Sequence, residues 1–128
     1  MAYLIDTHVL LFALYEPERL TPKARDLLED PDREIWFSAV SIWEVAIKSA
    51  LGRDDFTASP HRVIDEALAL GFRELGVTSL HAAGVVALPP LHADPFDRLL
   101  VAQAVATGHT LLTSDAWVAR YPGPIERI

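Results

Sequence analysis

The sequence predicts one α/β domain, built on a short, mostly parallel sheet flanked by helices. The chain has 128 residues, a length that suits one domain with one core, so residues 1–128 are treated as a single unit. Hydrophobic residues make up 51% of the chain, which is ample for burial and argues against disorder. Short apolar runs of strand character alternate with longer stretches of helical periodicity, which indicates a largely parallel sheet.

The first half of the chain predicts two buried strands and four helices. Apolar, β-prone runs indicate strands at residues 3–5 and 35–38. Ser41-Ile42-Trp43-Glu44 has the spacing of a capping box, in which the Glu44 side chain reaches back to the Ser41 N–H. Glu44 and Lys48 are also spaced as a helix-stabilising ion pair. Capping residues, prolines and glycines delimit the expected helices at 9–14, 22–29, 41–51 and 60–70.

The second half continues the same alternation. A helix begins after Thr78 or Ser79 and ends before Pro89-Pro90. A longer apolar helix follows Pro95 and ends at Gly108. Strands are expected at 72–75, 110–113 and 125–128.

The stretch from His92 to Ala104 carries the most informative polar pattern. It opens with two carboxylates three residues apart, with a proline between them. Because proline suits the first helical position, Asp94 is predicted at the N-cap, Pro95 at the first position and Asp97 in the first turn. Both acids can stabilise a helix start, Asp97 by lying near the positive end of the helix dipole.

Composition and charge exclude several classes of protein. The chain has no cysteine, which excludes a disulfide scaffold and a thiolate zinc site and is typical of a cytoplasmic protein. No apolar run approaches the ~20 residues of a membrane span, and the N-terminus lacks the features of a signal peptide. The formal net charge of -7 argues against a broad basic surface, so a nucleic-acid substrate would need a local basic patch or metal ions.

Four carboxylates from distant segments are expected to converge at one edge of the sheet. Asp6 and Asp115 follow predicted strands, and Glu44 and Asp97 lie near the starts of helices on the same side. Ligands of parallel sheets bind beyond the carboxyl ends of the strands. Each acid alone can be explained as a helix-start residue, but four like charges repel unless a cation or a proton neutralises them. Oxygen ligands favour Mg²⁺ or Mn²⁺ over zinc.

Four short motifs stand at these positions in the chain. They are Asp6-Thr7-His8, Ser41-Ile42-Trp43-Glu44, the run from Asp94 to Ala104, and Leu112-Thr113-Ser114-Asp115. Together they resemble the motifs of PIN-domain proteins, and most closely those of the VapC-type toxins of bacterial toxin–antitoxin pairs. Their order and spacing fit over nearly the whole chain. The resemblance implies a PIN-like single domain, metal-dependent ribonuclease activity on RNA, a toxin role, a cognate antitoxin that covers the site, and a homodimer.

The resemblance also implies which residues form the site. Asp6 and Asp97 are expected to bind Mg²⁺ or Mn²⁺, with Asp115 and Glu44 binding directly or through water. Asp94 is expected to be a neighbour of the site, because in much of the family the acid before this helix is not a ligand.

Further polar residues have both a structural and a functional interpretation. Thr7 and Ser114 can hydrogen-bond a carboxylate or can cap and turn the backbone. Arg98 and Lys48 can contact substrate phosphates, and for Arg98 a surface ion pair is an equally good explanation. The histidines near the motifs, which we expect to be structural, are His8, His81 and His92.

Other function classes fit less well. A receiver-type signalling domain needs an acidic pair after the first strand, where this chain has Asp6-Thr7. A haloacid-dehalogenase-like phosphatase needs an acid two residues after its nucleophilic aspartate, where this chain has His8. A catalytically inert binding module on the PIN fold remains an alternative, and metal-dependent RNA cleavage distinguishes it.

Overall fold

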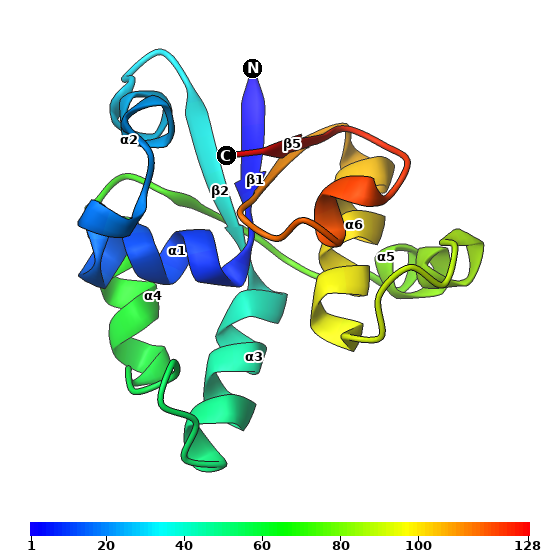
Figure 1. Cartoon of the computed structure of the whole chain (residues 1–128), viewed down its shortest axis with the longest axis horizontal. Coiled ribbons are helices and arrows are strands. Elements are labelled where there is room, and N and C mark those ends of the chain that lie inside the picture. The colour runs from blue at the N-terminus through cyan, green and yellow to red at the C-terminus, as the bar shows by residue number, and fades with distance from the viewer.

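The computed structural model, which describes all residues from Met1 to Ile128, contains one sheet of five parallel strands. The order across the sheet is β3-β2-β1-β4-β5, so the N-terminal strand is central (Figure 1). The strands are β1 (Ala2–Ile5), β2 (Glu34–Ser38), β3 (Arg73–Leu75), β4 (Thr110–Thr113) and β5 (Ile125–Arg127). The predicted α/β class is confirmed, and the sheet is parallel throughout.

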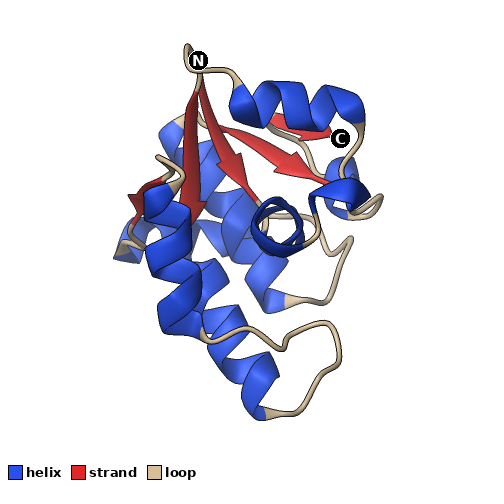
Figure 2. Ribbon diagram, turned by 90° about the vertical axis from the view of Figure 1, so that its left-hand side faces the viewer, coloured by secondary structure: helices blue, strands red, loops and turns tan.

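Six α-helices surround the sheet. They are α1 (Thr7–Tyr15), α2 (Pro22–Glu29), α3 (Ala39–Ala50), α4 (Pro60–Ala69), α5 (Ser79–Gly84) and α6 (Pro95–Thr107). Figure 1 shows α1, α2 and α4 on one side and α5 and α6 on the other, with α3 extending below the strands. The side view in Figure 2 shows the twisted strands running between the helices. None of the helices combines the length and the apolar content that crossing a bilayer requires.

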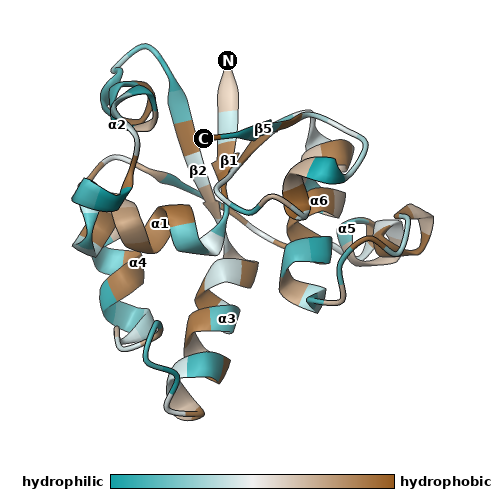
Figure 3. Ribbon diagram, in the orientation of Figure 1, coloured by the Kyte–Doolittle hydropathy of each residue, from teal (hydrophilic) through white to brown (hydrophobic).

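The two faces of the sheet bury separate hydrophobic clusters. Tyr3 and Ile5 pack with residues of α1, α2 and α4, whereas Leu4, between them, packs with residues of α6. Successive strand side chains point to opposite faces, so β1 contributes to both clusters. Figure 3 shows the hydrophobic colour toward the carboxyl end of β1 and along α1 beyond its hydrophilic start. The carboxyl end of β1 is therefore anchored on both faces, and Asp6 follows it directly.

Helix α6 begins and ends as the sequence predicts. Its N-cap is Asp94, whose Oδ1 accepts hydrogen bonds from the N–H groups of Phe96 at 2.8 Å and Asp97 at 3.3 Å. Pro95 occupies the first position. The helix ends at Gly108, whose φ of 79° lies in the left-handed region that favours glycine.

Helix α3 begins three residues earlier than the capping-box spacing predicts. Its N-cap is Ser38, whose hydroxyl accepts a hydrogen bond from the Val40 N–H at 3.0 Å. Ser41 and Glu44 therefore lie inside the helix, and both are buried. The capping-box prediction is therefore wrong. Two residues three apart lie on the same face of a helix both at its start and in its interior, so this spacing alone does not locate the start of the helix.

Candidate functional site

Asp6 lies buried between the end of β1 and the start of α1. Its backbone N–H donates to the Leu112 carbonyl at 3.0 Å, and its Oδ1 accepts from the Val9 N–H at 2.8 Å. Asp6 rather than Thr7 therefore caps α1. Burial raises the pKa of Asp6, although hydrogen bonds with the Thr113 side chain and the Val9 backbone oppose the shift.

Thr7 connects α1 to α3 through buried polar side chains. Its Oγ1 lies 2.9 Å from Ser41 Oγ and 2.5 Å from Glu44 Oε1, and all three residues are almost inaccessible to solvent. A threonine hydroxyl has one proton, so the consistent arrangement gives that proton to the carboxylate, with Ser41 donating to the Thr7 oxygen. Thr7 thereby fixes the orientation of Glu44, which was one of the two roles expected of it.

The Lys48 ammonium lies between two carboxylates. It forms a short ion pair with Glu44 on the same helix and reaches Asp94 Oδ2 at 3.4 Å. The rings of Phe56 and Phe96 have their centroids 5.0 and 5.4 Å from Lys48 Nζ, within the range of cation–π contacts. Burial acts to lower the pKa of Lys48, but the two carboxylates outweigh it and raise the pKa. The predicted Glu44–Lys48 pair is confirmed.

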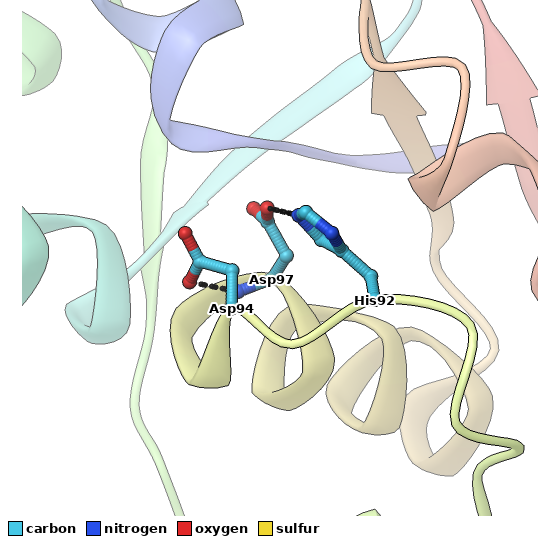
Figure 4. Close-up of side chains that lie close together, drawn as sticks. All are labelled: His92, Asp94 and Asp97. Atoms are coloured by element: carbon cyan, nitrogen blue, oxygen red, sulfur yellow. Dashed lines mark hydrogen bonds and ion pairs between the residues drawn. The ribbon is translucent and has the colours of Figure 1, made fainter.

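His92, Asp94 and Asp97 lie together where the preceding loop enters α6 (Figure 4). One ligand atom from each side chain lies within 4.8 Å of the other two. Nε2 of His92 is 3.0 Å from Oδ2 of Asp97. Figure 4 shows the carboxylates of Asp94 and Asp97 on the same side of α6. His92, which we expected to be only structural, therefore contacts a predicted metal ligand.

Asp97 stands among like charges. Burial raises the pKa of Asp97, and the negative charges of Asp94, Asp6 and Glu44 raise it further, to about 7, while His92 opposes them. These charges come from three separate parts of the chain, at the starts of α1 and α6 and in the middle of α3. The fold thus brings three of the four predicted acids within electrostatic reach of one another.

Asp115, the fourth predicted acid, lies after β4 and faces the turn that follows. Its Oδ1 accepts hydrogen bonds from the N–H groups of Trp117 at 2.7 Å and Val118 at 3.2 Å. No hydrogen bond or ion pair links its carboxylate to the other acids. Ser114, beside it, is half-buried and makes no side-chain hydrogen bond. The metal role of Asp115 and the supporting role of Ser114 stay predictions.

Arg98 holds the segment before α6 in place through hydrogen bonds. Its guanidinium donates to the Pro89 carbonyl at 3.0 Å, the Val85 carbonyl at 3.3 Å and the Tyr121 hydroxyl at 3.2 Å. The same hydroxyl lies 2.9 Å from the His92 N–H, which donates to it. Arg98 makes no ion pair, so that interpretation is wrong. Because protein groups already accept its hydrogen bonds, a phosphate contact is not favoured either.

The sequence does not reveal the contact of His92 with Asp97, because His92 has no partner at regular metal-ligand spacing. His92 and Asp97 are five residues apart, across a junction between loop and helix, where no fixed spacing applies. The sequence signal that could predict this contact is the N-cap at Asp94 with the proline after it. The chain just before an N-cap lies beside the first turn of the helix, which places His92 near Asp97. The other two histidines expected to be structural have structural contacts: His8 packs against Phe56, and His81 completes a capping box.

The donor atoms of the site suit a hard divalent cation. Asp6, Glu44 and Asp97 provide carboxylate oxygens, and His92 adds one imidazole nitrogen beside them. Burial and the negative charges of Asp94, Asp6 and Glu44 raise the pKa of Asp97, and a bound cation would relieve the repulsion among these acids. Mg²⁺ and Mn²⁺ accept carboxylate-rich ligand sets of this kind.

The sequence is similar to known proteins over nearly its whole length. The family model for the PIN domain matches residues 3–124. Ribonuclease VapC22 of Mycobacterium tuberculosis is 35% identical over 125 residues, which is 95% of this chain and 95% of that protein. The family match spans all four motifs.

Solved structures share the fold. One is VapBC2 from Rickettsia felis bound to a DNA fragment from its promoter, with a TM-score of 0.73, 17% identity, and coverage of 99% of this chain and 98% of that one. A second is a toxin–antitoxin complex from Klebsiella pneumoniae, with a TM-score of 0.62, 18% identity, and coverage of 97% and 95%. At these identities the likeness establishes the fold alone.

Proposed function

Because the chain belongs to the PIN-domain family, we propose that it is a metal-dependent ribonuclease that acts as the toxin of a toxin–antitoxin pair. The family match covers residues 3–124, and a ribonuclease is 35% identical over 95% of both chains. The reaction is hydrolysis of an RNA phosphodiester bond.

The observation that carries the proposal is the crowding of carboxylates around Asp97. Burial and the charges of Asp94, Asp6 and Glu44 raise the pKa of Asp97 to about 7. A protein gathers like charges in this way at a cost to its stability, and functional sites are where such perturbed groups cluster. A site for a divalent cation gives this arrangement a function.

Asp6 and Asp97 bind Mg²⁺ or Mn²⁺ in this proposal, with Glu44 and Asp115 holding it directly or through water. When bound, the ion activates a water molecule and stabilises negative charge on the phosphate. His92 orients the Asp97 carboxylate, and Thr7 orients that of Glu44. The acids thus reach the substrate in fixed positions, as a preorganised site requires.

An antitoxin and a second copy of the chain are the proposed partners. Structures with the same fold are described as toxin–antitoxin complexes, which supports an antitoxin here. The chain also exposes large apolar side chains, which mark protein interaction surfaces when they cluster. Among the most exposed are Leu51, Leu80 and Val86. Expression of the chain alone should slow growth, and co-expression of the neighbouring gene should restore it.

RNA cleavage tests the catalytic proposal and separates it from an inert binding module. Purified, partner-free protein should cleave RNA with Mg²⁺ or Mn²⁺ and stop when a chelator is added. Asp97→Asn should abolish most of the activity, whereas Asp26→Asn, at an exposed position on α2, should leave it unchanged. A folded wild-type protein that does not cleave RNA with either metal would favour the binding module.

A further inference from the structure

Lys48 has contacts that the ribonuclease proposal leaves unexplained. Only 12% of its side chain is accessible to solvent, and its ammonium group contacts Glu44 and Asp94. The rings of Phe56 and Phe96 enclose it further. A buried charge is unfavourable unless it is paired, so the fold places this cation among the acids with defined partners.

Each oxygen of Glu44 and Asp94 accepts at least one hydrogen bond from the chain. Oε1 of Glu44 accepts a hydrogen bond from the Thr7 hydroxyl, and Oε2 accepts one from the Lys48 ammonium. Oδ1 of Asp94 accepts hydrogen bonds from two backbone N–H groups of α6, and Oδ2 accepts one from Lys48. These two carboxylates are therefore satisfied by the chain itself, and Lys48 is their common counter-ion.

Asp6 and Asp97 differ from that pair. Neither makes an ion pair with a lysine or an arginine, and the only side-chain partner of Asp97 is His92. The Asp6 carboxyl group is buried, and the Asp97 side chain is only 16% exposed. The uncompensated negative charge of the cluster is therefore on the side of Asp6 and Asp97.

We propose that Lys48 takes the place of a second cation, so that the site holds a single divalent ion on the Asp6–Asp97 side. The inference rests on the proposed metal-dependent function. In two-metal sites the ions lie ~3.5–4 Å apart and divide the surrounding carboxylates between them. Here the ammonium group already neutralises Glu44 and Asp94, and its positive charge repels a further cation from them. Lys48 is a positioning residue that keeps Glu44 and Asp94 from holding a second ion, while Glu44 can still contact the first ion through water.

Counting bound Mn²⁺ tests this role directly. Free Mn²⁺ is measured by electron paramagnetic resonance during a titration of the folded protein without RNA. Wild type should bind a single ion per chain, and Lys48→Met should bind a second one, because Glu44 and Asp94 lose their counter-ion. Lys48→Arg keeps the charge and should stay at one. Lys23→Met removes an exposed lysine and is the matched control, also expected at one.

Adding Glu44→Gln to Lys48→Met removes one of the released carboxylates and should return the count to one. Two ions bound to wild type would overturn the inference while leaving the ribonuclease proposal intact, and this result is decisive even if Lys48→Met does not fold. A folded Lys48→Met protein that binds one ion with wild-type affinity would also overturn it. Absence of Mn²⁺ binding to wild type would overturn the inference, and RNA cleavage by the same preparations would then decide separately whether the ribonuclease proposal stands.

Discussion

Nε2 of His92 lies 3.0 Å from Oδ2 of Asp97, a contact between the loop before α6 and the first turn of that helix. The Tyr121 hydroxyl holds the His92 backbone from the other side, through its N–H at 2.9 Å and its carbonyl at 3.2 Å. The backbone that carries the imidazole is therefore held in place. When its Nε2–H donates to the carboxylate, the imidazole restricts the orientation of Asp97.

Replacing His92 should weaken the site without unfolding the protein. Groups that orient a metal ligand typically account for about 10- to 100-fold in metal affinity or activity, and we expect a loss of that size for His92→Ala. RNA cleavage and Mn²⁺ titration measure it. His61→Ala, at an exposed position on α4, is the control. Wild-type activity in His92→Ala would return His92 to the purely structural role that the sequence suggests.

The aspartates of the site should not contribute equally to RNA cleavage. Asp6→Asn and Asp97→Asn remove proposed direct ligands and should each lower RNA cleavage by about 100-fold or more, beyond the effect of an orienting neighbour. Asp94→Asn should lose less, because Asp94 caps α6 and pairs with Lys48. Asp115→Asn is expected to resemble Asp6→Asn. An equal loss at Asp94 would make it a ligand, and wild-type activity in Asp115→Asn would remove Asp115 from the site.

The sequence predicts well what depends on neighbouring residues. The start of α6 follows from Asp94 and the proline after it, and the strand before Asp6 follows from an uninterrupted apolar run. Alternating strands and helices then place Asp6 and Asp97 at the same edge, because the carboxyl ends of parallel strands meet there. These parts of the site can therefore be predicted from local sequence signals combined with a rule of topology.

What the sequence did not predict depends on contacts between distant residues. Ser41 and Glu44 have the spacing of a capping box, yet their partner is Thr7, which lies 34 and 37 residues away. Arg98 likewise finds its acceptors in the Val85 and Pro89 carbonyls and in Tyr121. A spacing rule cannot distinguish these outcomes, because the same side chain can cap, pair or brace according to what the fold brings beside it.

Mn²⁺ binding should weaken at acidic pH. The pKa of Asp97 without metal is about 7, so below that value the carboxyl carries a proton that the cation must displace. Apparent affinity should therefore fall by up to about tenfold per pH unit below pH ~7 and level off above it. Titrations at pH 6 and pH 8 test this expectation. Asp97→Asn should bind more weakly at both values and with a smaller pH dependence. Equal wild-type affinity at the two values would contradict it.

Arg98→Met should destabilise the fold rather than only weaken RNA binding. The substitution removes hydrogen bonds to the Val85 and Pro89 carbonyls and to the Tyr121 hydroxyl. Hydrogen bonds from a charged donor contribute about 1.5–3 kcal/mol each, so we expect a loss of at least about 2 kcal/mol in urea unfolding. Arg62→Met, which removes only an exposed pair with Glu66, should cost less than about 1 kcal/mol. Unchanged stability with lost RNA binding would instead support a phosphate contact.

Removing the Asp97 charge should stabilise the metal-free protein at neutral pH. Its pKa rises from 3.8 to about 7 on folding. Below pH ~4 the carboxyl is neutral in both states, so the shift has no effect on stability. Between the two values the unfolded chain loses its proton first, so folding becomes less favourable as pH rises. Above about 7 the full cost is present, on the order of a few kcal/mol at ~1.4 kcal/mol per pKa unit.

Asp97→Asn has no such cost. It gives up the interaction of a charge with the helix dipole, which contributes about 0.3–1 kcal/mol, and the charged partner of His92. With chelator at pH 8, the variant should therefore melt at or above the wild-type temperature, and the difference should shrink at pH 5. Excess Mn²⁺ should reverse the order, because ligand stabilisation follows RT ln(1 + [L]/Kd) and the variant binds more weakly. A metal-free variant that melts well below wild type at pH 8 would show that Asp97 acts mainly as a helix-start residue, and the metal assignment at its position would fail.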